Sequence, residues 1–146
     1  MQPEALGVAD RILAMEEARL EESKRMNAER DILLALAPDK WRELKVAFRS
    51  ECEKITAQSR LLQFECEEPD TQTFRISRMV GSVSVLALEF TFDIRVPRIV
   101  YEVHWGKRFS DSIGFVVTGS NVLFVKGSSG VILRDLLADL MMRITR

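Results

Sequence analysis

The sequence predicts an α+β fold with helices at both ends of the chain and an antiparallel sheet between them. Two observations support this class. Apolar residues follow a helical spacing up to about Arg60 and then alternate with a period of two. Residues 131–144 return to a helical pattern whose apolar side chains cover about half of the circumference. We therefore expect an N-terminal helical hairpin with a long first helix, a meander of about five or six strands, and a C-terminal amphipathic helix packed on the sheet.

The first predicted helix covers residues 4–36, because Pro3 suits a first helical turn and Pro38 ends the pattern. At 1.5 Å per residue it would be roughly 50 Å long, more than the width of a compact domain of this size. Its apolar residues recur at spacing seven in two imperfect rows, from which we take the interface candidates Leu6, Leu13, Leu20, Met26 and Leu33. We expect one domain, 1–146, in which residues 1–36 extend from the body and mediate association. The alternative is a helix laid across its own domain.

A second helix is predicted from about Asp39, a plausible N-cap residue, to Gln58. Its apolar stripe contains Trp41, Leu44, Phe48, Cys52 and Ile55. Because only Ala37 and Pro38 separate the two patterns, we expect the two helices to form an antiparallel hairpin.

Alternating segments after Arg60 predict the strands, at residues 62–66, 74–77, 86–94, 99–105, 113–118 and 122–125. Residues 67–72 read as a turn, and Pro97 places a loop between the two longest strands. The last predicted helix covers 131–144. One face of the sheet would take the helices, and the other is polar enough to meet water or a partner.

Composition argues against several classes of protein. The net charge is −1, and residues 1–60 carry 11 basic and 12 acidic side chains, so a nucleic-acid partner is not expected. The apolar stretch 83–90 is too short to span a bilayer, and the N-terminus has no signal-peptide pattern. We therefore expect a cytoplasmic protein without a membrane partner. Cys52 and Cys66 read as two buried thiols rather than a disulfide or redox pair.

One polar cluster contains the single histidine. A tight hairpin with Arg95 opposite Arg98 would pair Phe92 with Tyr101, Leu88 with Trp105 and Glu89 with His104. Glu89, Glu102 and His104 would then share one face of the sheet. A carboxylate beside an imidazole suits acid–base chemistry or a metal ion, but a solvated cross-strand pair accounts for the same residues. We therefore favour the structural interpretation and expect no cofactor and no metal.

The glycine-containing segment 126–130 is a candidate phosphate loop. Lys126 precedes both Gly127 and Gly130, whereas a phosphate-binding loop places its lysine after the last glycine. A corner between a strand and the last helix, with Ser128 or Ser129 as the helix cap, is the favoured interpretation.

The leading hypothesis is a non-catalytic interaction protein that self-associates through the N-terminal helix, the outer sheet face or both. A homodimer is favoured, and another protein is the other option for a partner. The first alternative is a carrier of small apolar ligands, with a pocket between the sheet and the last helix lined by Phe90, Phe92, Tyr101, Leu136, Leu140 and Met141. The second is an enzyme that uses Glu89, Glu102 and His104.

Overall fold

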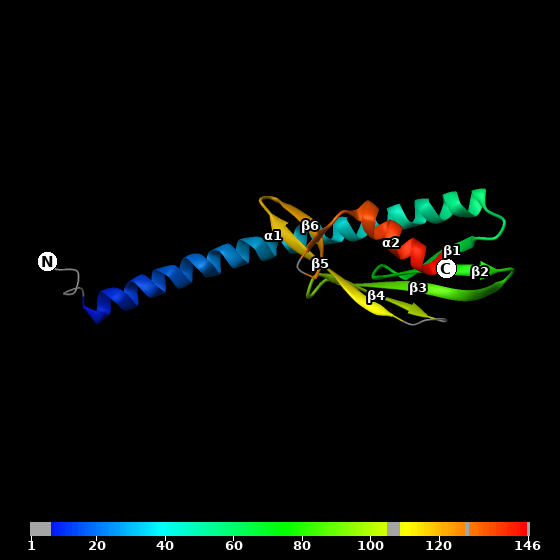
Figure 1. Ribbon diagram of the computed structural model, residues 1–146. Helices are drawn as coiled ribbons and strands as arrows, with labels where there is room; N and C mark the ends of the chain where they lie inside the picture. Colours follow the sequence, from blue (N-terminus) through cyan, green and yellow to red (C-terminus); the bar gives the residue numbers. More distant parts are fainter. Residues whose placement is uncertain (1–6, 105–108, 128, 146) are drawn as a thin grey trace.

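The computed structural model describes residues 7–104, 109–127 and 129–145, and these form an α+β fold (Figure 1). A long helix is followed by seven antiparallel strands in meander order and by a short C-terminal helix. The predicted class, the long first helix, the antiparallel sheet and the last helix are confirmed. The predicted hairpin of helices and the count of five or six strands are wrong.

Helix α1 runs without a break from Val8 to Gln58, and Pro38 lies inside it. Its 51 residues make it roughly 76 Å long. A proline removes one N–H donor and strains the preceding turn, which costs about 3 kcal/mol in a helix interior. Here that cost is offset because one apolar stripe continues across the proline, burying Ala37 before it and Trp41 and Leu44 after it. Asp39 is therefore not an N-cap, and its carboxylate pairs with Arg42 one turn later.

The two parts of α1 differ in their environment. Residues 7–31, which we call the overhang, are exposed throughout, and burial begins at Ile32. Figure 1 shows the overhang projecting away from the sheet, while the second half of α1 lies along it. Three ion pairs between residues three apart, such as Arg19–Glu16 at 3.3 Å, line the surface of the overhang.

The sheet contains seven strands: β1 (Gln63–Asp70), β2 (Thr73–Val80), β3 (Val83–Asp93), β4 (Arg98–His104), β5 (Ser110–Thr118), β6 (Asn121–Lys126) and β7 (Ser129–Val131). Each strand pairs with its sequence neighbour. Strand β1 extends to Asp70, so the predicted turn at 67–72 is reduced to residues 71–72. The strand can include Pro69 because this residue lies on an edge strand next to an irregularity in the pairing. The short strand β7 was missed, since Ser129 and Gly130 carry no apolar alternation.

The β3–β4 pairing differs from the prediction by two residues. Phe90 faces Tyr101 and Asp93 faces Arg98, so four residues rather than two form the loop. Asp93 Oδ1 accepts a hydrogen bond from the backbone N–H of Arg95 at 3.0 Å, which stabilises the start of this longer turn. A shift of two residues keeps every side chain on its predicted face. The predicted partner Trp105 lies outside the described residues.

Both helices cover the same face of the sheet. Helix α2 (Leu133–Thr145) buries Leu136, Leu140, Met141 and Ile144 in one core with the apolar stripe of α1. The ring of Phe90 lies at the centre of this core, 5.0 Å from the Phe48 ring centroid and 5.9 Å from that of Tyr101. The opposite face of β1–β4 carries Arg75, Glu89 and Glu102, as the alternation predicted, and also Glu67, which was predicted to lie in a turn. Among the described helices, none is long and apolar enough to cross a membrane.

Candidate functional site

The polar face of the sheet brings together the three residues that the sequence singled out for chemistry. Glu89 on β3 faces Glu102 on β4, and His104 lies two residues further along β4. One potential ligand atom from each of the three lies within 4.8 Å of the other two. The predicted grouping is therefore present, although Ala87 rather than Glu89 stands opposite His104.

Arg75 on β2 already neutralises part of this cluster. Its Nε and Nη2 atoms both donate to Glu89 Oε2, at 2.9 and 2.7 Å. The same guanidinium lies 3.4 Å from Glu67 on β1. Glu67, Arg75, Glu89 and Glu102 thus form a row of side chains across four neighbouring strands. A row of this kind is what cross-strand charge pairing produces on a solvated sheet.

The imidazole of His104 lies at the end of this row, with Nε2 at 3.9 Å from Glu102 Oε1. The Glu102 side chain is 52% exposed, and the cluster lies on the face opposite both helices. Two carboxylates and an imidazole are chemically suited to a divalent cation. A cation would have to compete with Arg75 for Glu89, however, because two nitrogen atoms of that guanidinium already donate to Glu89 Oε2. The arrangement therefore fits a structural role best.

The predicted apolar pocket residues are packed against one another. Phe90, Tyr101 and Leu140 are completely buried, and Phe92, Leu136 and Met141 are at most 5% exposed. Leu136, Leu140 and Met141 of α2 lie in the same cluster as the three aromatic residues of the sheet. These side chains form the contact between α2 and the sheet, and the carrier hypothesis stays a prediction.

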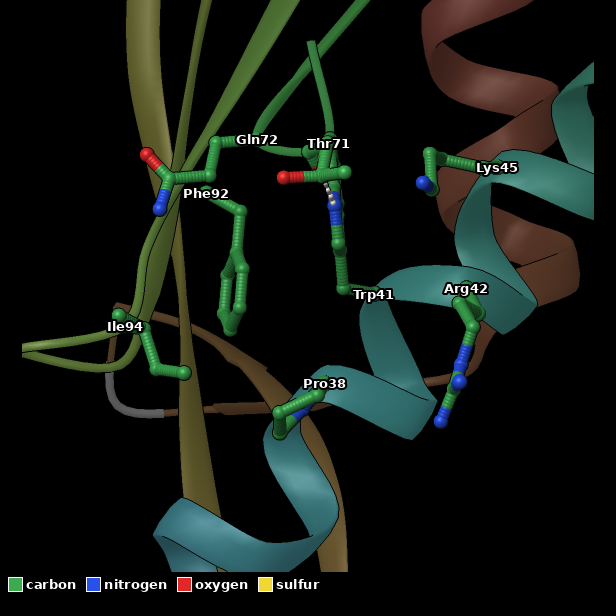
Figure 2. Close-up of a pocket in the computed structure, with 8 residues that line it drawn as sticks. All are labelled: Pro38, Trp41, Arg42, Lys45, Thr71, Gln72, Phe92 and Ile94. Carbon is green, nitrogen blue, oxygen red and sulfur yellow. Dashed lines mark hydrogen bonds between the residues drawn. The ribbon is translucent and has the colours of Figure 1, made fainter.

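A surface hollow of about 310 Å³, which the sequence did not predict, lies between α1, the β1–β2 turn and the end of β3. Figure 2 shows Trp41 and Phe92 side by side in it, with Pro38 and Ile94 at one end. The two rings stack at 5.6 Å. The cationic residues at its rim have partners, since Arg42 pairs with Asp39 and Lys45 lies 3.3 Å from Glu68. No local pattern could reveal this hollow, because its walls come from three segments.

The interface candidates on the overhang are exposed wherever they are described. Leu13 is 62% exposed, Leu20 58% and Met26 59%, whereas Leu33 is partly buried at the start of the body. Leu6 lies outside the described residues. Val8 and Met15 are exposed apolar residues of the same segment that were not predicted, and Ile12, which belongs to one of the two predicted rows, is exposed as well. Their spacing of four and three was readable as a helical stripe.

The glycine-containing loop is a β-hairpin turn rather than a corner between a strand and a helix. Lys126 pairs with Ser129 across it, and Gly127 adopts a φ of +66°. Because Ser129 belongs to β7, it does not cap α2, which begins four residues later at Leu133. Ser128 lies outside the described residues. The loop therefore does not lead directly into a helix N-terminus, which is the arrangement that phosphate binding uses.

Comparison of the chain with protein-family models, with curated proteins and with solved structures gives no match.

Proposed function

We propose that this chain is a non-catalytic interaction protein that forms a homodimer through its overhang. The observation that carries the proposal is an unbroken helix whose first half, residues 7–31, is exposed throughout, although its last turns border a shallow hollow beside β5. Six large apolar side chains on this segment are more than half exposed: Val8, Ile12, Leu13, Met15, Leu20 and Met26.

These six side chains are gathered on one side of the helix. At 3.6 residues per turn they all lie within roughly half of its circumference. The same half contains the line along which Trp41, Leu44 and Phe48 pack on the sheet. The apolar face of α1 therefore continues past the edge of its own sheet, and a neighbouring helix can cover the remainder.

A helix without tertiary contacts is marginal in water. Its intrinsic propensity and its surface ion pairs contribute only a few tenths of a kcal/mol each. Burial of an apolar side chain contributes about 1.5–3 kcal/mol when it is complete. Pairing the six exposed side chains is therefore the largest stabilisation available to the overhang.

A second copy of the same chain suits this face in its charge. The overhang mixes acidic and basic side chains along its length, and ion pairs such as Arg19–Glu16 hold them on the helix surface. The overhangs of two copies would therefore approach each other without a strong excess of positive or negative charge. Asn27 interrupts one of the two apolar rows. A polar residue at such a position fixes how two paired helices align along their length, at some cost in stability.

The test compares two double variants with the same added charge. Leu13→Glu with Leu20→Glu places carboxylates on the apolar side, and Ala14→Glu with Ala28→Glu places them on the opposite side of the same helix. By light scattering, the unmodified chain and the alanine-site variant should have about twice the single-chain mass of 16.7 kDa. The leucine-site variant should have the single-chain mass and an unchanged unfolding midpoint of the body.

A third variant tests the sheet as an additional surface. Val80 and Val83 face each other on β2 and β3 and are each 62% exposed. Val80→Glu with Val83→Glu should leave the mass at about twice the single-chain value if the overhang is the main contact. An unmodified chain that scatters as a single copy at micromolar concentration would contradict the proposal.

A further inference from the structure

The two cysteines of the chain meet at the junction of α1 and β1. Cys52 belongs to the buried stripe of α1 and is 2% exposed, whereas Cys66 on β1 is partly exposed. Both line a surface hollow of about 290 Å³, together with Arg49 and Thr56 of the same helix. The sequence predicted two separate buried thiols. That expectation missed their proximity, because a contact between a helix and a strand leaves no mark on either local pattern.

Both are free thiols, and their side chains line the same hollow. The Cys52 thiol is placed to donate a hydrogen bond to the sulfur of Cys66, which raises the pKa of Cys52, and burial raises it further. The same hydrogen bond lowers the pKa of Cys66, and the nearby Arg49 guanidinium lowers it as well, against the opposing effect of burial. The two thiols are therefore unequal, and Cys66 is the one that favours the thiolate.

Arg49 is held beside Cys66 by its other contacts. Its Nη2 atom donates to Glu68 Oε1 at 2.9 Å, and its guanidinium carbon lies 5.6 Å from the ring centroid of Phe74. Glu68 follows Cys66 by two residues on β1. The cation is thus fixed at the rim of the hollow through which a small reagent would reach the sulfur of Cys66.

We propose that Cys52 and Cys66 form an oxidation-sensitive dithiol, in which Cys66 is the residue attacked by peroxide and Cys52 is the resolving residue. In the first step the Cys66 thiolate attacks one oxygen of hydrogen peroxide. The O–O bond breaks, hydroxide leaves, and Cys66 becomes a sulfenic acid. In the second step the Cys52 sulfur attacks the Cys66 sulfur and loses its proton. The S–O bond breaks, one water leaves, and an intramolecular disulfide remains. A dithiol reductant returns both residues to thiols.

The disulfide would change the fold at a defined place. Strand β1 is at the edge of the described sheet, where it pairs with β2, and α1 packs against it. A covalent bond from Cys52 to Cys66 would fasten this edge to the last turns of α1. It closes a short loop of the chain, which constrains the unfolded state and stabilises the folded one.

The experiment treats the reduced full-length chain with hydrogen peroxide and follows intact mass and alkylation of free thiols. The unmodified chain should lose two hydrogens, remain a single covalent chain, and resist alkylation until dithiothreitol is added. In Cys52→Ser, dimedone should trap a sulfenic acid on Cys66. In Cys66→Ser, oxidation of the remaining thiol should be at least tenfold slower, because that thiol is buried.

Chain unfolded in guanidinium chloride is the control, since unfolding removes both the contact with Arg49 and the burial of Cys52. The two single variants should then react with peroxide at similar rates. Three results would overturn the proposal: two thiols that still alkylate fully after peroxide, a disulfide that joins two chains, or equal oxidation rates of the two variants in the folded state.

Discussion

Trp41 of α1 donates its indole N–H to the backbone carbonyl oxygen of Thr71 across 2.9 Å. The same indole stacks on Phe92, and the ammonium of Lys45 lies 5.2 Å from its ring centroid. One side chain thus fastens the long helix to the β1–β2 turn and to the core. This contact lies just after Pro38, at the point where α1 begins to lie on the sheet.

Trp41→Phe should destabilise the protein by about 1–2 kcal/mol, because it removes the hydrogen bond and keeps most of the apolar contact. Trp41→Ala should cost about 3–5 kcal/mol, since it also leaves a cavity against Phe92. Urea unfolding followed by circular dichroism measures both. Equal losses for the two variants would show that the ring contact contributes nothing.

Pro38→Ala should raise the free energy of unfolding by about 1–2 kcal/mol. The alanine restores an N–H donor inside α1, and part of this gain is offset because the unfolded chain becomes more flexible. Pro69→Ala on β1 is the control, because that proline lies on a strand and its replacement restores no helical hydrogen bond. A lower stability of Pro38→Ala would contradict a continuous helix and favour a turn at this position.

The row of charges on the open sheet face should show energetic coupling between Arg75 and Glu89. Arg75→Gln leaves the carboxylate of Glu89 directly opposite that of Glu102, and it should cost about 1–2 kcal/mol. Adding Glu89→Gln removes the like-charge pair and should recover part of this loss. Chemical denaturation of the two single variants and the double variant measures the coupling, and strictly additive losses would contradict it.

Stability should fall at acid pH through Asp111. The backbone N–H of Ser112 donates to this carboxylate at 2.8 Å, and Lys126 Nζ lies 3.5 Å away. The hydrogen bond from Ser112 lowers the pKa of Asp111 most, and the positive charge of Lys126 lowers it further. A carboxyl with a lowered pKa in the folded state contributes stability above its unfolded value, near 4. That contribution is lost as pH falls through the lower folded pKa.

The corresponding measurement is the urea midpoint at a series of pH values from 5 downward. Asp111→Asn should reduce the acid-induced fall in the midpoint, because the variant has no carboxyl to protonate at this site. Asp10→Asn on the overhang is the matched control and should follow the unmodified chain. An identical pH profile for Asp111→Asn and the unmodified chain would contradict the assignment.

Local periodicity was enough to predict the fold class and most of the strands. The alternation of Leu88, Phe90 and Phe92 with Glu89 and Thr91 placed each residue on its correct face, because a strand has only two faces. The register of β3 and β4 could not be predicted in the same way. It depends on the length of the 94–97 loop, which the Asp93 side chain helps to set.

The remaining differences arise from interactions between distant segments. Pro38 would end a helix that has only its own hydrogen bonds, but the buried residues on both sides of it outweigh the local cost. The proximity of Cys52 to Cys66 and the hollow at Trp41 likewise depend on where α1 meets the sheet. The three-residue cluster at His104 could be predicted because its members lie on two strands of one hairpin.

Hydrogen exchange of the backbone amides in residues 10–31, measured at two protein concentrations, tests the proposed dimer most directly. In a pair of overhangs these amides are protected, and the protection rises with protein concentration because it depends on association. We expect that result. Exchange of residues 10–31 at the rate of an unfolded chain, or protection that is the same at both concentrations, would contradict pairing of the overhang with a second copy.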